Sequence, residues 1–376
     1  MTPDLDDAAA LEAADPGAML RAIASSAAQV REAVTLSAEA GLVALAGEDR
    51  PRSIVVCGMG GSGIAGDVLA AVLGAKAPVP VLTHRGYGLP TWVGAADLVI
   101  AVSCSGSTEE TLSALEEAVR RGCRLLVVAG AGSPAEDLAS RGRALFVPVP
   151  QGRQPRASVW ALSTPLVIAA DHLGLVQAPA GVVEETAVCL EGVATRCRID
   201  ADTVVNPAKT LATELLDTVP VLWGTSPLAG VAAYRFACQL NENAKVPATW
   251  GVLPEANHNQ VVGFDGPFAG RGSADLFHDP YDDDDPTPST TRIRLVLLRD
   301  AEEHPQVARR ADVSTELAEE RHVGVTALRA AGETSFERIA WLIGTTDYAS
   351  AYLALLQGTD PTPVDAITAL KDRIRR

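Results

Sequence analysis

Two stretches of the sequence decide the fold: SIVVCGMGGSGIAGD at residues 53–67 and DLVIAVSCSGSTEET at residues 97–111. In each, a loop rich in glycine or hydroxyl side chains joins an apolar run to a helical pattern. This arrangement is typical of a parallel strand followed by a helix. Backbone N–H groups at such a helix N-terminus, together with hydroxyls, favour an anion site. Two such loops in one sheet are expected to converge on one ligand, most simply a phosphate attached to a hydroxylated body.

The surrounding sequence alternates between strand and helix patterns. Because parallel strands need crossover helices, and these strands are near-continuous apolar runs, we predict a doubly wound α/β domain. The predicted strands are 53–57, 79–83, 97–103, 123–129 and 144–149, and the predicted helices are 19–46, 63–74, 108–121 and 134–141. Helical patterns follow at 159–174 and 181–198.

A second alternation begins at 219–224 and resembles a degenerate copy of the first at an offset of 167 residues, which places its next strand at 246–248. Later strands are predicted at 292–298 and 322–327, with helices at 227–243, 305–320, 334–343 and 346–357. The chain is therefore expected to hold two α/β domains in tandem. The predicted divisions are a flexible N-terminus at 1–18, an N-terminal domain at 19–158, a helical linker region at 159–200 and a C-terminal domain at 201–376 with an acidic insertion at 266–291.

Composition limits the partners and the compartment. The 376 residues carry a formal net charge of −16, which argues against nucleic acid or a membrane surface as a main partner. No stretch of eighteen apolar residues predicts a transmembrane helix. The acidic N-terminus lacks the basic segment of a secretory signal, and six cysteines without a CxxC pair favour free thiols in the cytoplasm. Asp282–Asp285 lack the alternating spacing of a calcium loop, so a solvated loop is expected there and no metal site is predicted.

Residues 58–63 also satisfy the GxGxxG pattern of dinucleotide-binding proteins. That fingerprint needs an acidic residue at the end of the next strand to bind the ribose, whereas this chain has Thr83-His84-Arg85 there. Arg85 would suit a 2′-phosphate, so NADP stays open on this point alone. The hydroxyls of the second loop, which a dinucleotide does not need, weigh against this reading.

The second loop carries hydroxyls at Ser103, Ser105, Ser107 and Thr108. Helix N-capping by Ser107 or Thr108 is the simplest alternative to ligand binding. One cap explains one hydroxyl and leaves the others without a role, so the cluster is predicted to bind an anion.

Taken together, these motifs resemble the sugar isomerase (SIS) family, in particular the bifunctional phosphoglucose/phosphomannose isomerases built from two SIS domains. The resemblance rests on GMGGSGIAGD at 58–67, SCSGSTEET at 103–111, PRAS at 155–158, NENAK at 241–245 and LPEANHN at 253–259, completed by DPTPVDAITALK at 360–371. It departs from the family at Cys104, where an aromatic residue is usual, at Ser107, where asparagine is common, and in the acidic insertion.

The residues suit aldose–ketose isomerisation, which needs a base, a ring-opening group and a cation near the developing oxyanion. Glu242, near a helix C-terminus where a carboxylate is electrostatically unfavourable, is the predicted base, ahead of Glu255. Arg156 is the predicted cation, with a surface salt bridge as the alternative. The resemblance implies that His258 opens the ring from the neighbouring subunit of a dimer, and that Lys371 lies near the sugar, although Lys371 reads equally well as an exposed helix lysine.

The resemblance implies a cofactor-free enzyme that interconverts fructose 6-phosphate with glucose 6-phosphate or mannose 6-phosphate. Gly61, Ser62, Ser103, Ser105, Ser107 and Thr108 would hold the 6-phosphate. Two alternatives stay open: a sugar-phosphate sensor without activity, and an isomerase of another phosphosugar. The presence of both Glu242 and His258 favours an enzyme, because a sensor needs no base.

Overall fold

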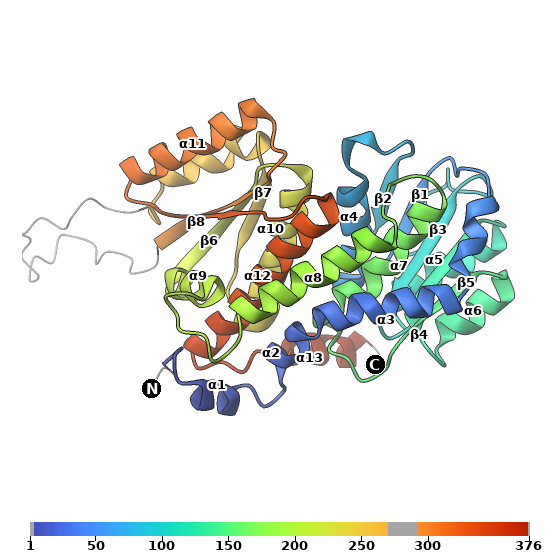
Figure 1. Ribbon diagram of the computed structural model, residues 1–376, viewed down its shortest axis with the longest axis horizontal. Helices are drawn as coiled ribbons and strands as arrows, with labels where there is room; N and C mark the ends of the chain where they lie inside the picture. The colour runs from blue at the N-terminus through green and yellow to red at the C-terminus, as the bar shows by residue number, and fades with distance from the viewer. Residues whose placement is uncertain (1–3, 270–291, 375–376) are drawn as a thin grey trace, which may run out of the picture. The chain divides into compact units, whose positions relative to one another are not determined.

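The computed structural model describes residues 4–269 and 292–374. Most of the acidic insertion, including Asp282–Asp285, lies outside the described residues. The chain divides into two compact units (Figure 1). The first unit consists of residues 21–195 and 332–344, and the second consists of residues 1–20, 196–331 and 345–376. Each unit is built around its own parallel sheet.

The first unit contains a five-stranded sheet with the order β2-β1-β3-β4-β5, in which all neighbours pair in parallel. β1 and β3 are therefore adjacent although β2 lies between them in sequence, and both are buried along their whole length. From β1 the next strand is added on one side of the sheet, and from β3 the following strands are added on the other side. Open α/β sheets bind ligands at the carboxyl ends of the two strands where this change occurs. The strands are β1 (Ile54–Cys57), β2 (Val81–His84), β3 (Leu98–Ser103), β4 (Arg124–Gly130) and β5 (Leu145–Val149).

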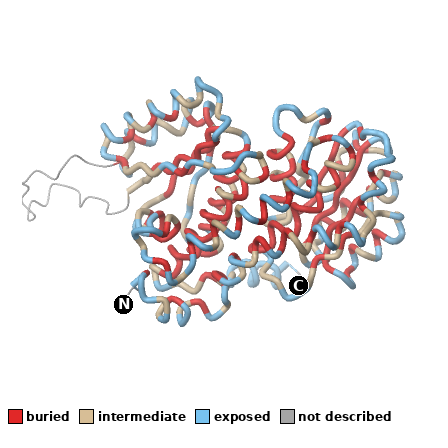
Figure 2. The backbone as a smooth tube through the Cα atoms, in the orientation of Figure 1, coloured by how far each residue is buried: buried red, intermediate tan, exposed pale blue. Residues whose placement is uncertain are grey.

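Helices cover both faces of this sheet, and the central strands β1 and β3 lie in the buried interior of the unit (Figure 2). α4 packs against β1, β2 and α7, whereas α5 and α6 pack against each other and against β4. The helices are α3 (Ser26–Glu39), α4 (Gly60–Leu73), α5 (Glu109–Arg120), α6 (Pro134–Gly142), α7 (Val159–His172) and α8 (Ala180–Arg196).

The second unit contains a four-stranded parallel sheet with the order β7-β6-β8-β9, which repeats the order of the first four strands of the first unit. The prediction of two doubly wound parallel sheets in tandem is confirmed. The strands are β6 (Thr218–Gly224), β7 (Thr249–Val252), β8 (Arg292–Arg299) and β9 (Gly324–Arg329). The helices are α1 (Ala8–Ala14), α9 (Pro207–Leu215), α10 (Pro227–Gln239), α11 (Pro305–Glu320) and α13 (Asp365–Ile374).

The predicted strand at 246–248 is wrong, because β7 begins at Thr249 and pairs Val221 with Thr249. The residues before β7 instead form the C-terminal end of the helix that begins with α10 (Pro227–Gln239). After α10 the chain makes a π-helical turn at Leu240–Ala244, and Val246 donates its N–H to the carbonyl oxygen of Leu240 over 3.1 Å.

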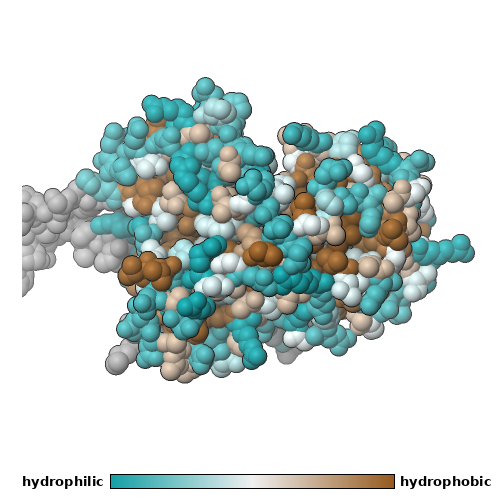
Figure 3. Space-filling model, viewed as in Figure 1, coloured by the Kyte–Doolittle hydropathy of each residue, from teal (hydrophilic) through white to brown (hydrophobic). Residues whose placement is uncertain are grey.

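The two helices predicted at 334–343 and 346–357 are one helix, α12 (Ser335–Leu356). Gly344 does not break it: a Cβ at that position would lie 3.2 Å from Val193 of α8, so the glycine allows close helix packing. Among the described helices, α12 is long and apolar enough to span a membrane, but 89% of its most apolar window is buried, which is typical of a core helix. The face seen in Figure 3 is mostly hydrophilic, with small separate hydrophobic areas.

The N-terminal region is more structured than expected. Residues 4–18, predicted to be flexible, include α1, and Leu5 and Leu11 are buried. The single helix predicted at 19–46 is divided into α2 (Met19–Ala24), α3 and a 3-10 helix at Leu42–Gly47. Ser25 and Ser26 donate to the carbonyls of Ala22 and Ile23, which competes with helix continuation.

Candidate active site

The first glycine-rich loop leaves β1 and starts α4 with exposed donors. A Cβ at Gly58 would lie 3.0 Å from the carbonyl oxygens of Ser62 and Val102, so the turn requires glycine there. The Met59 carbonyl accepts from the N–H groups of Ser62 and Gly63. Within the described part of the chain, the N–H groups of Gly60 and Gly61 make no hydrogen bond. These two donors at a helix N-terminus are suited to an anion.

The second loop holds its hydroxyls in a network of short contacts. The Ser103 and Thr108 hydroxyls lie 3.0 Å apart, and the Ser103 hydroxyl also accepts from the N–H of Gly106 over 3.0 Å. Ser107 donates from its N–H and its hydroxyl to the Ser105 hydroxyl, over 3.3 and 3.1 Å. Thr108 occupies the N-cap position of α5, but its side chain makes no capping bond. Helix capping therefore does not account for this hydroxyl.

The two loops and the PRAS segment meet at one edge of the sheet. The N–H of Cys104 donates to the Ser62 hydroxyl over 3.2 Å, which joins the second loop to the first. A Cβ at Gly61 would lie 3.4 Å from the carbonyl oxygen of Pro155 and 3.7 Å from Cα of Arg156. The 3-10 turn at Pro155–Ala157 thus packs directly on the start of α4.

Arg156 is placed by this packing and is only 7% exposed. Its turn is anchored by Gln29 of α3, whose side chain donates to the Ala157 carbonyl over 2.7 Å and accepts from the Ala161 N–H over 3.3 Å. Its backbone lies beside the N-terminus of α4, because a Cβ at Gly61 would lie 3.7 Å from Cα of Arg156. The structure thus brings Arg156 together with all six predicted phosphate-binding residues in the first unit.

The three other predicted catalytic residues lie in the second unit. Glu242 is half-buried in the π-helical turn that follows α10. π-helical turns are rare and occur frequently at functional sites. The sequence predicted the helix but not this change in its winding.

His258 is exposed at the end of a 3-10 turn, Glu255–His258. Its neighbours do not orient it: Asn257 donates to the Ser314 hydroxyl over 2.8 Å, and Asn259 donates to Glu255 over 3.0 Å. Within the described residues, neither asparagine hydrogen-bonds to the imidazole of His258. Lys371 lies on α13, a helix that is exposed along its whole length.

Comparison with known proteins follows the same division of the chain. The SIS domain model matches residues 49–151, and the model of the bacterial phospho-glucose isomerase C-terminal SIS domain matches residues 204–374. A bifunctional phosphoglucose/phosphomannose isomerase from Caldicellulosiruptor bescii is 33% identical over 85% of this chain and 89% of its own length. One from Aquifex aeolicus is 30% identical over 86% of this chain and 91% of its own length.

This chain belongs to the bifunctional phosphoglucose/phosphomannose isomerase family. It is therefore an enzyme of the sugar-phosphate isomerase class. Solved structures agree on the fold. A hypothetical protein from Thermus thermophilus matches with a TM-score of 0.68 and 17% identity, covering 95% of this chain and 90% of that one. A putative phosphosugar isomerase from Clostridium difficile 630 matches with a TM-score of 0.65 and 14% identity, covering 94% and 97%.

In this isomerase the equivalent loops of the second unit are bonded to each other within the described residues. After β6, Ser226 caps α10 by accepting from the Ala229 N–H over 3.1 Å, and it donates to the Asp300 carboxylate over 2.8 Å. Asp300 follows β8, and its N–H donates to the Thr225 hydroxyl over 3.0 Å. An internal carboxylate thus lies where the first unit offers donors to a ligand, and its charge disfavours a bound phosphate.

Cys104 lies in the second loop of this isomerase, between Ser103 and Ser105. Burial raises the pKa of its thiol, and the opposing effects of the Ser158 hydroxyl and of Arg153 are smaller. The side chain is therefore a neutral thiol at neutral pH. Its hydrogen bond with the Ser158 side chain joins the second loop to the PRAS segment.

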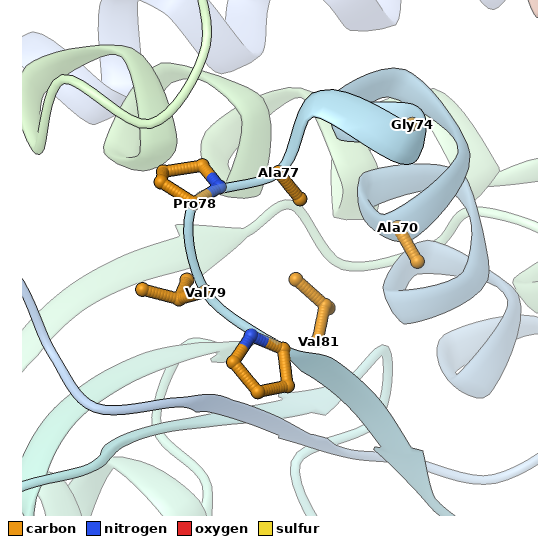
Figure 4. Close-up of a pocket in the computed structure, with 7 residues that line it drawn as sticks. Ala70, Gly74, Ala77, Pro78, Val79 and Val81 are labelled. Atoms are coloured by element: carbon orange, nitrogen blue, oxygen red, sulfur yellow. The ribbon is translucent and has the colours of Figure 1, made fainter.

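The pocket in Figure 4 is separate from the two loops and the PRAS segment. It measures about 370 Å³ and lies where the chain enters β2, at the amino end of the strand, whereas the loops lie at the carboxyl ends. Only alanine, glycine, proline and valine line it, as the sticks in Figure 4 show. It offers no polar side chain to a substrate.

Proposed function

We propose that this chain interconverts fructose 6-phosphate with glucose 6-phosphate and mannose 6-phosphate through an enediolate, without a cofactor. The observation that carries the proposal is the junction of the two loops with the PRAS segment. It brings together the N–H groups of Gly60 and Gly61, the turn that carries Arg156, and the hydroxyls of Ser62, Ser103, Ser105, Ser107 and Thr108. The names of the relatives support the choice of hexose phosphates.

In the proposed reaction, the first unit holds the 6-phosphate and Glu242 moves the proton. The carboxylate removes the proton from C2 of the open-chain aldose, the electron pair forms the C1–C2 double bond, and the carbonyl oxygen on C1 becomes negative. Arg156 stabilises this charge. Return of the proton to C1, with transfer of the hydroxyl proton from O2 to O1, gives the ketose. His258, with Lys371, opens the sugar ring.

We further propose that the enzyme works as a homodimer in the cytoplasm, with His258 supplied to the site of the neighbouring subunit. The exposed position of His258, without a hydrogen bond in the described chain, is compatible with that role. The six cysteines, all within the described residues, form no disulfide, as is usual in a reducing compartment.

Replacement of Glu242 by glutamine tests the base. We expect Glu242→Gln to lower turnover of fructose 6-phosphate by on the order of 10²–10⁴-fold, because loss of a general base removes a contribution of that size. Inhibition by inorganic phosphate should stay unchanged, since the phosphate loops are untouched. A coupled assay that detects both aldose products measures turnover, and wild-type activity in this variant would remove Glu242 from the mechanism.

Another phosphosugar is the second candidate. A D-glucosamine-6-phosphate 4-epimerase from Sulfolobus acidocaldarius is 31% identical over 56% of this chain and 63% of its own length. Assays with fructose 6-phosphate and with glucosamine 6-phosphate in parallel separate the two activities. A protein that binds both sugars and converts neither would instead support the sensor reading.

A further inference from the structure

The π-helical turn that carries Glu242 is held by side chains that the proposed mechanism does not use. The turn spans Leu240–Ala244, and the next residue, Lys245, has a left-handed backbone with φ of 59°. Helices that end in this conformation usually have glycine there, because a Cβ is disfavoured. A lysine at this position therefore needs a reason beyond ending the helix.

The ammonium group of Lys245 supplies that reason. Its Nζ donates to the carbonyl oxygens of Glu242 over 2.9 Å and of Asn243 over 3.1 Å, and to that of Asp360 over 3.3 Å. The last carbonyls of a helix lack partners within the helix. Here one side chain binds two of them and ties the turn to the segment that follows α12.

Asn243 anchors the same turn from its buried side. It is fully buried, and its amide donates to the Ser350 hydroxyl over 2.9 Å. Ser350 donates in turn to the Asp347 carbonyl over 2.7 Å. Asp347 forms a two-bond ion pair with Arg235 of α10, at 3.0 and 2.6 Å. The turn that carries Glu242 is thus fixed to α12 and to the segment after it.

We propose that Lys245 is a positioning residue, which fixes the direction of the Glu242 carboxylate by capping the π-helical turn, with the Asn243–Ser350 hydrogen bond as the second anchor. The inference rests on the proposed function, because it matters for catalysis only if Glu242 is the base. Reacting groups tolerate little displacement, so a turn that rewinds into an α-helix would move the carboxylate out of reach.

The test compares Lys245→Met, Lys245→Arg and Ser350→Ala with the wild type and with Lys76→Met. Lys76 is an exposed lysine of the first unit and serves as the matched control. The measurements are kcat and KM for fructose 6-phosphate, inhibition by inorganic phosphate, and thermal unfolding.

Lys245→Met should lower kcat by about 10–100-fold while KM and phosphate inhibition stay within about twofold. Lys245→Arg should retain more activity, because a guanidinium can donate to the same carbonyls. Ser350→Ala should lower kcat in the same way. In the double variant that combines Lys245→Met with Ser350→Ala, kcat should fall by less than the product of the two single fold-losses, since both changes act through one carboxylate. Lys76→Met should behave as the wild type.

Several results would overturn the inference. Wild-type kcat in Lys245→Met would do so, as would a raised KM at constant kcat, which would place Lys245 on the substrate. Loss of activity only in proportion to unfolded protein would indicate a purely structural role. If Lys245→Met does not fold, Lys245→Arg and Ser350→Ala decide. Turnover by Glu242→Gln would defeat the proposed function, whereas an inactive Glu242→Gln beside fully active Lys245→Met and Ser350→Ala would defeat this inference alone.

Discussion

Gly106 lies where the second phosphate loop touches the start of α6. Its backbone is left-handed, with φ of 68°, and a Cβ there would lie 2.0 Å from the Ser133 hydroxyl and 2.3 Å from the Ser133 Cβ. Ser133 is buried, and its hydroxyl has no hydrogen-bond partner within the described chain. Two separate features therefore favour glycine at position 106: the left-handed backbone and the close side chain of Ser133.

We expect Gly106→Ala to weaken both stability and substrate binding. The left-handed backbone should cost roughly 1–2 kcal/mol for alanine. The overlap with Ser133 should add about 1–3 kcal/mol as the loop shifts, and KM for fructose 6-phosphate should rise because the loop hydroxyls move. Urea unfolding and steady-state kinetics measure the two effects.

Gly122→Ala is the matched control for Gly106→Ala. Gly122 has nearly the same φ, 66°, but a Cβ there would meet nothing within 4 Å. This variant should show the backbone cost alone, with an unchanged KM. Equal stability losses in both variants, with KM unchanged in each, would contradict the role given to the contact between Gly106 and Ser133.

At the scale of elements, the sequence predicted correctly those strands and loops whose position depends on the local residue pattern. β1 and β3 are continuous apolar runs, and the loops after them carry their own glycines and hydroxyls, so both could be placed before the structure was known. β7 was misplaced because the repeat was extended across the π-helical turn, which has no counterpart in the first unit. The turn depends on Ser350, more than a hundred residues from Asn243. No pattern around residue 241 contains that partner.

Asp97 shows how one carboxylate joins the starts of two strands. It is fully buried and accepts hydrogen bonds from Arg52, from the Ser53 hydroxyl over 2.7 Å and from the Gly94 N–H over 2.9 Å. Burial acts to raise the pKa of this carboxyl, but the bonds from Arg52, Gly94 and Ser53 outweigh it and lower the pKa. A lowered pKa in the folded state stabilises the protein above the unfolded pKa, and that stabilisation is lost as pH falls through the folded pKa.

We expect Asp97→Asn to reduce the free energy of unfolding by about 1–3 kcal/mol at pH 7, because buried donors lose their acceptor. The deficit relative to the wild type should begin to shrink below about pH 4, where Asp97 of the unfolded wild-type chain takes up its proton, and should keep shrinking as pH falls toward the lowered folded pKa. Urea unfolding of both proteins from about pH 3 to about pH 7 measures this difference in the free energy of unfolding. The range includes the ordinary pKa of aspartate. Asp49→Asn, at an exposed carboxylate, should match the wild type throughout. A deficit that is constant across this range would contradict the assignment.

At the scale of the whole molecule, two sheets with the same strand order carry different chemistry at equivalent edges. In the first unit, the N–H groups of Gly60 and Gly61 make no hydrogen bond within the described residues, and the Ser62 hydroxyl accepts from the Cys104 N–H. In the second unit, Ser226 already donates to the Asp300 carboxylate. If the first unit binds phosphate as proposed, the duplicated fold holds one open anion site within the described residues, because Asp300 occupies the equivalent edge of the second unit. Of the predicted catalytic residues of the second unit, Glu242 follows α10, His258 follows β7 and Lys371 lies on α13.

We therefore expect each chain to bind one molecule of a hexose-phosphate analogue such as 5-phosphoarabinonate, whatever the number of subunits. Calorimetric titration should give one site per chain. Ser62→Ala should weaken this binding, because it removes a hydroxyl of the phosphate site. Ser226→Ala, the same change at the equivalent edge of the second unit, should leave binding unchanged and should cost roughly 1 kcal/mol of stability through loss of the α10 cap. Two sites per chain, or binding that is weakened by Ser226→Ala and not by Ser62→Ala, would show that Asp300 does not close the second edge.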